Sequence, residues 1–445
     1  MDSRRGESAS SYSVCLILRL ATSCRPLVKR PPEHAFKTVL SLGGGALRGT
    51  VEVMVLMELE NSIKQYWLEH SECLTEELGI TSVDDFDINL ADYFDCMTGI
   101  SAGGWMAAYL ASRGGQGASK FVLEDPAVVE KYGSIPAGAA EGLRVFFNEY
   151  GSTIYPLDTL DLNAGTPFDP TNPLAPGSTT PLFALDGLER ALEAFVGNTT
   201  LADADTTLLI PTVNLETNLV VYFVNNAFKS PAVTSTATLV SRMGARPIPL
   251  AGEGLTPDIL FDEGKDYFLK DIGAAAGAGI AAHPAKQMKQ AGNDTVEFQL
   301  VDGGLIIHNA DLFGALFVSS EGSTFGFGKV AVLSIGAAHP LLNFSDLSNA
   351  GNLQWSQGAR TQAFLGYGGL RLFPALMDYL YYANPSTKPF QYLRINGLGS
   401  MPPVRQFANS GIDYRSVPVF EDLGKRVAAE HRELIDTFVR DFIFG

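Results

Sequence analysis

The sequence lacks the features that mark several special classes of protein. It contains no run of about 18 or more apolar residues, so we expect no membrane-spanning helix. Basic residues are scarce: 32 lysines and arginines stand against 49 aspartates and glutamates, which gives a net charge of −17. Because a nucleic-acid partner requires a basic face, this balance argues against one. It does not favour docking on anionic lipid either, although screening over about 8 Å leaves local patches free to differ from the total.

Signatures of metal binding and of disulfide frameworks are missing as well. The four cysteines form no C-x-x-C pair, and the six histidines show no H-E-x-x-H or similar spacing. We therefore predict no metal site and no cofactor. Hydrophobic residues make up 46% of the chain and charged residues 18%, an ordinary globular balance in 445 residues, which are enough to bury a large core.

Residues 1–35 differ in composition from the rest of the chain. They are rich in arginine and serine and poor in acidic residues, and Arg19 interrupts their apolar piece, which is atypical of a secretory signal. This composition is that of an organelle transit peptide; a disordered extension with no targeting role fits it equally well. We place these residues outside the fold as a flexible leader. We expect a cytoplasmic or membrane-peripheral protein, with a plastid or mitochondrion as the location that a transit peptide would give.

The stretch from Asp92 to Leu110 has the pattern of a nucleophile elbow. A short apolar run typical of a buried strand is followed by Gly99-Ile100-Ser101-Ala102-Gly103, and then by apolar residues at helical spacing. In a G-x-S-x-G elbow the sharp turn exposes the serine hydroxyl, and the two glycines let strand and helix approach without a Cβ clash. We therefore predict Ser101 as a nucleophile, with an ordinary glycine-rich loop as the alternative.

A second glycine-rich loop lies closer to the start of the predicted fold. A short apolar strand ending at Leu42 leads into Gly43-Gly44-Gly45-Ala46-Leu47-Arg48-Gly49, and a buried helix is predicted over 51–67. The loop lacks the G-K-[ST] ending of a P-loop, and its spacing does not match the dinucleotide fingerprint. What remains is a loop whose exposed backbone N–H groups can bind an oxyanion, with a simple tight turn as the alternative.

The rest of the chain predicts further strands and helices of an α/β protein. An alternating strand over 296–301 ends at Asp302-Gly303-Gly304, which by itself is an ordinary turn. A Gly- and Pro-rich surface loop or insertion, a candidate lid, is predicted around 163–181. Strands are also predicted at 207–214, 219–224, 329–335 and 392–395, and helices at 182–195 and 420–442.

Taken together, the three motifs in this order resemble those of the patatin family of lipid acyl hydrolases. The elbow follows Asp92-Tyr93-Phe94-Asp95, as the family's elbow often does, the loop at 43–49 is similar to its oxyanion motif, and Asp302-Gly303-Gly304 matches its catalytic aspartate motif. Gly43 and Ala46 depart from the D-G-G-G form of the loop, so the pattern leaves open which amides face the substrate. The resemblance covers residues 36–445 and implies one three-layer α/β/α domain with a mostly parallel central sheet.

The resemblance implies acyl transfer by a Ser–Asp dyad. Ser101 attacks the ester, Asp302 takes its proton directly, and the N–H groups of Gly44, Gly45 and Ala46 hold the oxyanion. The other motif residues support these groups: Gly43, Arg48, Gly49, Gly99, Gly103, Gly303 and Gly304. Such an enzyme is a calcium-independent hydrolase of the phospholipase A type, acting peripherally at membranes on phospholipids, lysophospholipids or galactolipids. The sequence does not indicate an oligomeric state.

Three alternatives remain open from the sequence. His308 or His339 follows Asp302 and could complete a Ser–His–Asp triad. Arg48 could anchor the glycine loop or bind a lipid phosphate. The chain could also be a non-catalytic lipid-binding or storage protein with the same fold.

Overall fold

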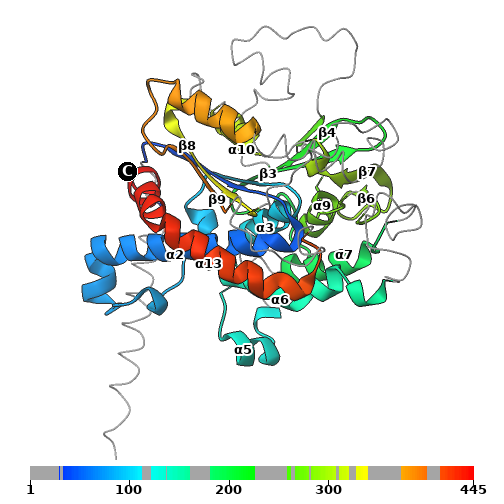
Figure 1. Ribbon diagram of the computed structural model, residues 1–445, viewed down its shortest axis with the longest axis horizontal. Helices are drawn as coiled ribbons and strands as arrows, with labels where there is room; N and C mark the ends of the chain where they lie inside the picture. Colours follow the sequence, from blue (N-terminus) through cyan, green and yellow to red (C-terminus); the bar gives the residue numbers. More distant parts are fainter. Residues whose placement is uncertain are drawn as a thin grey trace, which may run out of the picture.

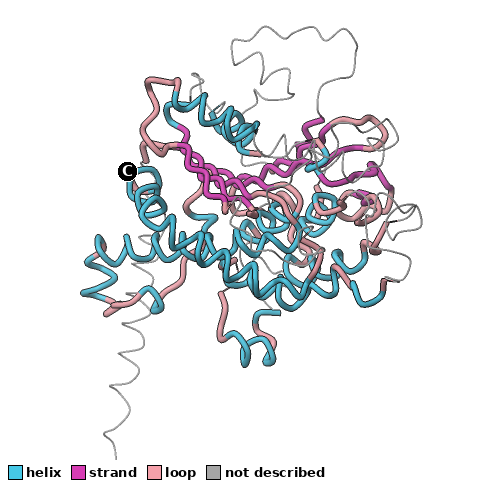
Figure 2. The backbone as a smooth tube through the Cα atoms, in the orientation of Figure 1, coloured by secondary structure: helices cyan, strands magenta, loops and turns pink. Residues whose placement is uncertain are grey.

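The computed structural model describes most of the chain (Figures 1 and 2). The described residues are 30, 34–112, 122–136, 138–160, 181–225, 258–261, 266–279, 282–306, 310–319, 327–338, 372–397 and 411–445. The predicted insertion at 163–181, apart from Pro181, lies outside them, as do His308 and His339. Within the described part of the chain, no helix combines the length and the apolar character needed to cross a bilayer.

A nine-stranded sheet forms the centre of the fold, with the order β5-β4-β3-β2-β1-β8-β9 and with β7 joining β3 to β6. The strands are β1 (Lys37–Leu42), β2 (Cys96–Gly99), β3 (Thr207–Asn214), β4 (Val220–Val224), β5 (Asp258–Phe261), β6 (Lys286–Lys289), β7 (Val296–Asp302), β8 (Val330–Gly336) and β9 (Tyr392–Asn396). Five of the eight strand pairings are parallel, including those around β1 and β2. The mostly parallel α/β sheet predicted from the sequence is confirmed.

Helices pack on both faces of this sheet. They are α2 (Gly49–His70), α3 (Ala102–Ala111), α5 (Pro126–Tyr132), α6 (Ala140–Ile154), α7 (Asp186–Val196), α9 (Leu269–Ala276), α10 (Asp311–Ser319) and α13 (Val417–Phe438), with a helical segment at 372–382. Short 3₁₀ or π turns lie at Ala46–Arg48, Cys73–Glu77, Val83–Asp85, Leu90–Asp92, Leu157–Thr159, Gly303–Leu305, Phe327–Lys329, Tyr414–Ser416 and Val439–Ile443.

Side chains that point alternately to the two faces of the sheet produce the three layers. In β1, Leu40 and Leu42 point into the larger core under α2, α3, α6 and α13, whereas Val39 points into a smaller core under α10. Figure 1 shows α10 on one side of the sheet and α2, α13 and α6 on the other. The three-layer α/β/α arrangement therefore follows from strands that are apolar on both faces.

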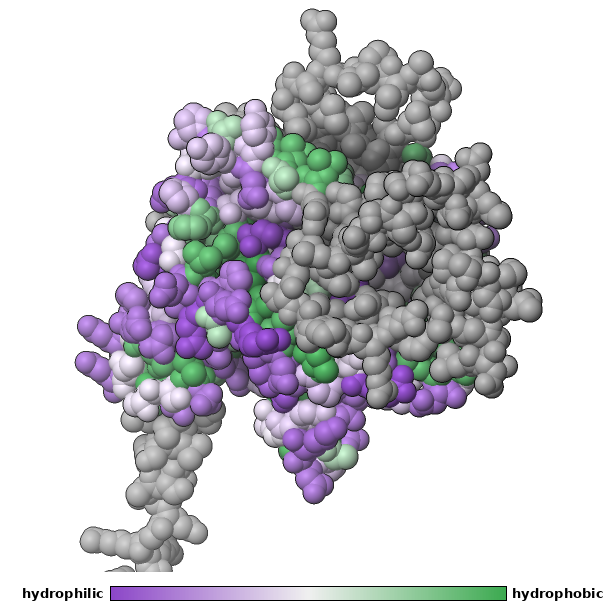
Figure 3. Space-filling model, in the orientation of Figure 1, coloured by the Kyte–Doolittle hydropathy of each residue, from purple (hydrophilic) through white to green (hydrophobic). Residues whose placement is uncertain are grey.

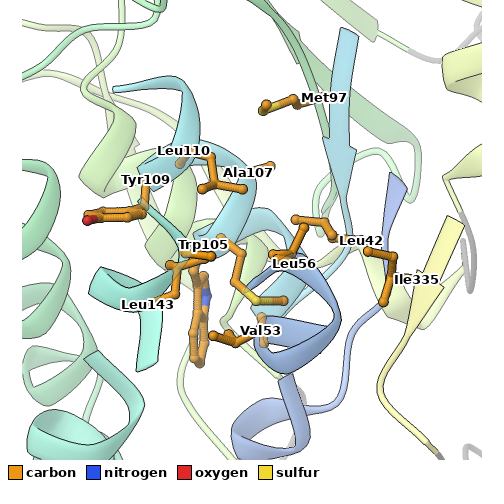
Figure 4. Close-up of a cluster of buried hydrophobic side chains, with 14 of the residues drawn as sticks. Leu42, Val53, Leu56, Met97, Trp105, Ala107, Tyr109, Leu110, Leu143 and Ile335 are labelled. Carbon is orange, nitrogen blue, oxygen red and sulfur yellow. The ribbon is translucent and has the colours of Figure 1, made fainter. Parts of the chain in front are cut away.

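The larger core lies directly beneath the predicted elbow. Trp105 of α3 and Leu143 of α6 pack near Val53 and Leu56 of α2 (Figure 4). On the outside, α2 and α13 present mainly hydrophilic side chains, with apolar groups visible in the seams between elements (Figure 3). The helix that follows Ser101 thus rests on a well-packed base, which favours a rigid site.

The N-terminal boundary of the fold differs from our prediction. Arg30, which we assigned to the flexible leader, is buried, and its guanidinium donates to the carbonyl oxygen of Ile443 at 2.9 Å and to Asp95 Oδ2 at 2.6 Å. Burial raises the pKa of Asp95, but Arg30, the N–H of Thr38 and Lys37 outweigh it and hold that pKa below its usual value. Composition could not reveal this, because two of the partners of Arg30 are main-chain carbonyls at the far end of the chain.

Candidate active site

The strand–turn–helix context expected around Ser101 is present. Strand β2 ends at Gly99, helix α3 begins at Ala102, and Ser101 between them has φ 56° and ψ −125°. A positive φ is strained for a non-glycine residue, and such strain is typical of functional positions held by their surroundings. Ser101 is partly exposed in an otherwise buried segment, so its hydroxyl can be reached by a substrate.

The two glycines of the pentapeptide are required by close backbone contacts. A Cβ on Gly99 would lie 2.1 Å from the carbonyl oxygen of Gly103. A Cβ on Gly103 would lie 2.3 Å from the carbonyl oxygens of both Leu42 and Gly43. Any side chain at either position would push apart β2, α3 and the glycine loop, which together define the site.

The glycine loop lies against Ser101 because β1 and β2 are parallel neighbours in the sheet. A Cβ on Gly44 would be 2.7 Å from Ser101 Cβ. The N–H of Gly43 is occupied, since it donates to the carbonyl oxygen of Ile335 at 2.9 Å. Among the described residues, no hydrogen-bond acceptor is found for the N–H groups of Gly45 and Ala46, and Ala46 adopts a positive φ of 52°.

Asp302 is the last residue of β7 and reaches Ser101 from the neighbouring part of the sheet. Its partner across β3 is Thr212, and a Cβ on Gly303 would lie 2.4 Å from the carbonyl oxygen of Pro211, so only glycine fits there. The Ser101 side chain lies close enough to the Asp302 carboxylate to lower its pKa, and the N–H of Gly304 donates to Asp302 Oδ1 at 2.8 Å. The structure thus brings together two side chains that lie far apart in the sequence.

Burial raises the pKa of Asp302 toward the range that suits a general base. Desolvation raises its pKa to about 6, against the opposing hydrogen bonds from Ser101 and Gly304. A carboxylate with a pKa near 6 is better matched to proton transfer near neutrality than one at its ordinary value of about 3.9.

The sequence analysis did not identify two further buried residues, Tyr155 and His283. Tyr155, at the end of α6, is buried; desolvation and the charge of Asp302 raise its pKa, while Arg48 opposes the rise. The ring of His283 lies 5.5 Å from the Tyr155 ring, and burial lowers the pKa of His283 to about 4, so its imidazole is neutral. The only signal for Tyr155 was the Ile-Tyr-Pro step at 154–156, and nothing in the sequence distinguished His283.

Arg48 is itself buried, at 6% exposure. A Cβ on Gly45 would lie 3.3 Å from Arg48 Nε, so the guanidinium packs directly behind the loop. This placement favours the anchoring role over contact with a lipid phosphate. Among the residues described above, no group of three or more His, Cys, Asp or Glu side chains could hold a metal ion.

Comparisons with known proteins point to plant relatives. No protein-family model matches the chain. Patatin-like protein 2 of Arabidopsis thaliana is 24% identical over 343 residues, covering 73% of this chain and 67% of that protein. Two proteins of Oryza sativa subsp. indica are also similar. Patatin-like protein 1 is 24% identical over 275 residues (61% of this chain, 49% of that protein), and patatin-like protein 2 is 26% identical over 323 residues (69% and 62%).

The chain spans about half to two thirds of the length of these relatives. Among solved structures, VipD from Legionella pneumophila overlaps 90% of this chain and 68% of its own, with 12% identity and a TM-score of 0.28. A superposition this loose supports no conclusion about the site.

Proposed function

We propose that this chain, which belongs to the patatin-like family, hydrolyses acyl ester bonds of glycerolipids with Ser101 as nucleophile and Asp302 as base. The observation that carries the proposal is the interaction of Ser101 with the Asp302 carboxylate, whose pKa is raised by burial, beside the N–H groups of Gly45 and Ala46, for which no acceptor is found among the described residues. Nucleophile, base and oxyanion donors are the three parts that acyl transfer needs in one place.

The mechanism follows from this arrangement. Asp302 accepts the hydroxyl proton as Ser101 Oγ bonds to the ester carbon, and the carbonyl oxygen becomes an oxyanion facing Gly44, Gly45 and Ala46. The positive end of α3 adds to this stabilisation, and removing one donor from such a site costs roughly 3 kcal/mol. As the intermediate collapses, the proton on Asp302 passes to the leaving alcohol and an acyl-serine remains. Water then attacks this ester with Asp302 again accepting a proton, and the fatty acid leaves as Ser101 regains its hydrogen.

The substrate class is proposed from the family and from binding energy. Each methylene of an acyl chain that is buried contributes about 0.8 kcal/mol, so a lipid enzyme can draw affinity from a long chain. We propose a phospholipid, lysophospholipid or galactolipid as substrate, cleaved as by a phospholipase A. The proposed mechanism uses only side chains and amides of this chain, so we expect it to proceed without calcium.

A fluorophosphonate probe tests the nucleophile. We expect it to label the wild-type protein and to leave Ser101→Ala unlabelled. The matched control is Ser62→Ala, since Ser62 also donates to an aspartate, Asp436 Oδ1 at 2.6 Å, but lies between helices with no glycine loop. Release of fatty acid from a panel of glycerolipids in the presence of EDTA then identifies the substrate. A folded wild-type protein that binds lipid but is neither labelled nor active would instead be a binding or storage protein.

We also propose that the protein works peripherally on a lipid surface, through apolar side chains at the rim of the site. Leu305 and Ile306 directly follow the Asp302 motif and are 38% and 45% exposed. Inserting such side chains into lipid contributes about 1–2 kcal/mol each. The Leu305→Ser/Ile306→Ser double variant should therefore bind phosphatidylcholine vesicles about tenfold or more weakly in a sedimentation assay.

The control for this surface is Val129→Ser on α5, which is 39% exposed and is separated in sequence from the site motifs. It should bind vesicles like the wild type. Equal binding by all three proteins would show that the rim does not contact lipid.

A further inference from the structure

A glutamate is buried beside Gly43, the residue before Gly44, which packs against Ser101. Glu52 lies in the first turn of α2 and is 0% exposed. A Cβ on Gly43 would be 3.4 Å from Glu52 Oε1, so the carboxyl group lies directly beneath the loop. Among the described residues, neither carboxyl oxygen has a hydrogen-bond partner of normal geometry. An ionised carboxylate left unpaired in the interior is very costly, so this geometry requires the neutral acid.

The nearest charges do not remove that cost. Arg394 of β9 donates to Ser334, and the hydroxyl of Ser334 donates to Asp311 Oδ1 at 2.7 Å. Tyr392 donates to the other oxygen, Asp311 Oδ2, also at 2.7 Å. The positive charge of Arg394 is therefore already balanced by Asp311 of α10. An ionised Glu52 would add a second carboxylate to this buried cluster.

Gly336 connects the cluster to the loop. A Cβ on Gly43 would lie 3.3 Å from Gly336 Cα, and a Cβ on Gly336 would meet Arg394 Nη2 at 2.5 Å and Asn396 Oδ1 at 2.9 Å. These two glycines allow the ends of β1 and β8 to approach closely, with Glu52 on one side and Arg394 on the other. A negative charge on Glu52 would therefore change the electrostatic potential at the backbone that precedes the proposed oxyanion donors.

We propose that Glu52 is a positioning residue that stays protonated beneath the glycine loop and keeps this part of the loop free of negative charge while the oxyanion forms. This inference rests on the proposed function. Burial raises the pKa of Glu52 well above its usual value, and Asp311 adds to the rise. Arg394 and the N–H of Gly43, which is already bonded to Ile335, oppose it.

The proposal predicts that activity falls at alkaline pH and that ionisation of Glu52 alone causes the fall. As the pH rises through the pKa of Glu52, the carboxylate that forms repels the oxyanion of the intermediate. This repulsion is strong because both negative charges are buried and close to each other. In the wild type, kcat should fall about tenfold or more toward pH 10, with KM little changed. Glu52→Gln cannot ionise, so it should keep wild-type kcat at pH 7 within about threefold and lose the alkaline decline.

Glu60→Gln is the matched control. Glu60 lies two turns further along α2, is buried at 8% exposure, and accepts a hydrogen bond from the N–H of Ala140 at 2.9 Å. Desolvation raises the pKa of Glu60 to about 8, so Glu60 titrates within the pH range of the experiment but lies about 12 Å from Glu52 along the helix. Glu60→Gln should keep the alkaline decline of the wild type.

The experiment measures kcat and KM for ester hydrolysis, and the rate of fluorophosphonate labelling of Ser101, from pH 6 to pH 10 for the three proteins. An unchanged alkaline decline in Glu52→Gln, or an inactive but folded Glu52→Gln at pH 7, overturns the role of Glu52. A wild type that is never labelled overturns the proposed function instead. Infrared difference spectra of wild type minus Glu52→Gln give a direct readout, because a protonated Glu52 adds a carboxyl C=O band at pH 7. Its absence also overturns the proposal.

Discussion

An Asp302→Asn variant is expected to hydrolyse ester about 10²–10⁴ more slowly than the wild type, with little change in KM. The amide fits the same space and can still hydrogen-bond to Ser101, but it cannot accept the serine proton. The wild type should lose kcat/KM as the pH falls below about 6, because Asp302 is then protonated, and the variant should lack this acidic decline. Steady-state kinetics from pH 4.5 to pH 8 measure both effects.

The free energy of unfolding of Asp302→Asn distinguishes loss of the catalytic base from loss of the folded structure. Since burial raises the pKa of Asp302 above its unfolded value, the folded state holds the proton more tightly, and its stabilising contribution is lost as the pH rises toward 6. Asp302→Asn should therefore be as stable as the wild type, or more stable, at pH 7. Asp436→Asn, which changes the helix-bound partner of Ser62, is the control and should remain active. An Asp302→Asn enzyme within tenfold of wild-type kcat would place the base elsewhere, for example on a histidine.

The second large effect is on the stability of the folded protein. Gly103→Ala is expected to lower the free energy of unfolding by about 3 kcal/mol or more, because the new Cβ would lie 2.3 Å from two backbone carbonyl oxygens that cannot move independently. Urea unfolding followed by circular dichroism measures the loss. The control is Gly151→Ala in α6, where the nearest atom, Tyr414 Cβ, is 3.3 Å from the new methyl group. That variant should stay within about 1 kcal/mol of the wild type. Similar stabilities for both variants would mean that β2, α3 and the loop are not packed as described.

The sequence predicted the parts of the fold that depend on local pattern. Strands such as β3 and β8 are continuous apolar runs bounded by turn residues, and the elbow has its glycines at fixed spacing from Ser101. The pairing of Ser101 with Asp302 was predicted from the resemblance to the patatin family and not from local pattern. The roles assigned to these residues remain predictions that the experiments above test.

What could not be predicted depends on contacts between distant segments. The sequence could not tell which amides of the loop are available, since the N–H of Gly43 is taken by Ile335 of β8. A glutamate at position 52 would ordinarily be assigned to the exposed face of a helix, and only the packing of β8 against α2 shows that it is buried. Short strands such as β6, which we did not predict, form because β7 offers a free edge.

The position of β1 between β2 and β8 has a consequence for the order of synthesis. While the chain emerges from the ribosome, β1 can pair with β2 early, but its other edge must wait for β8, which begins at Val330. During that interval the middle of the nascent sheet presents unsatisfied backbone groups and apolar side chains to solvent. Slow translation between these segments should therefore increase the demand for chaperones.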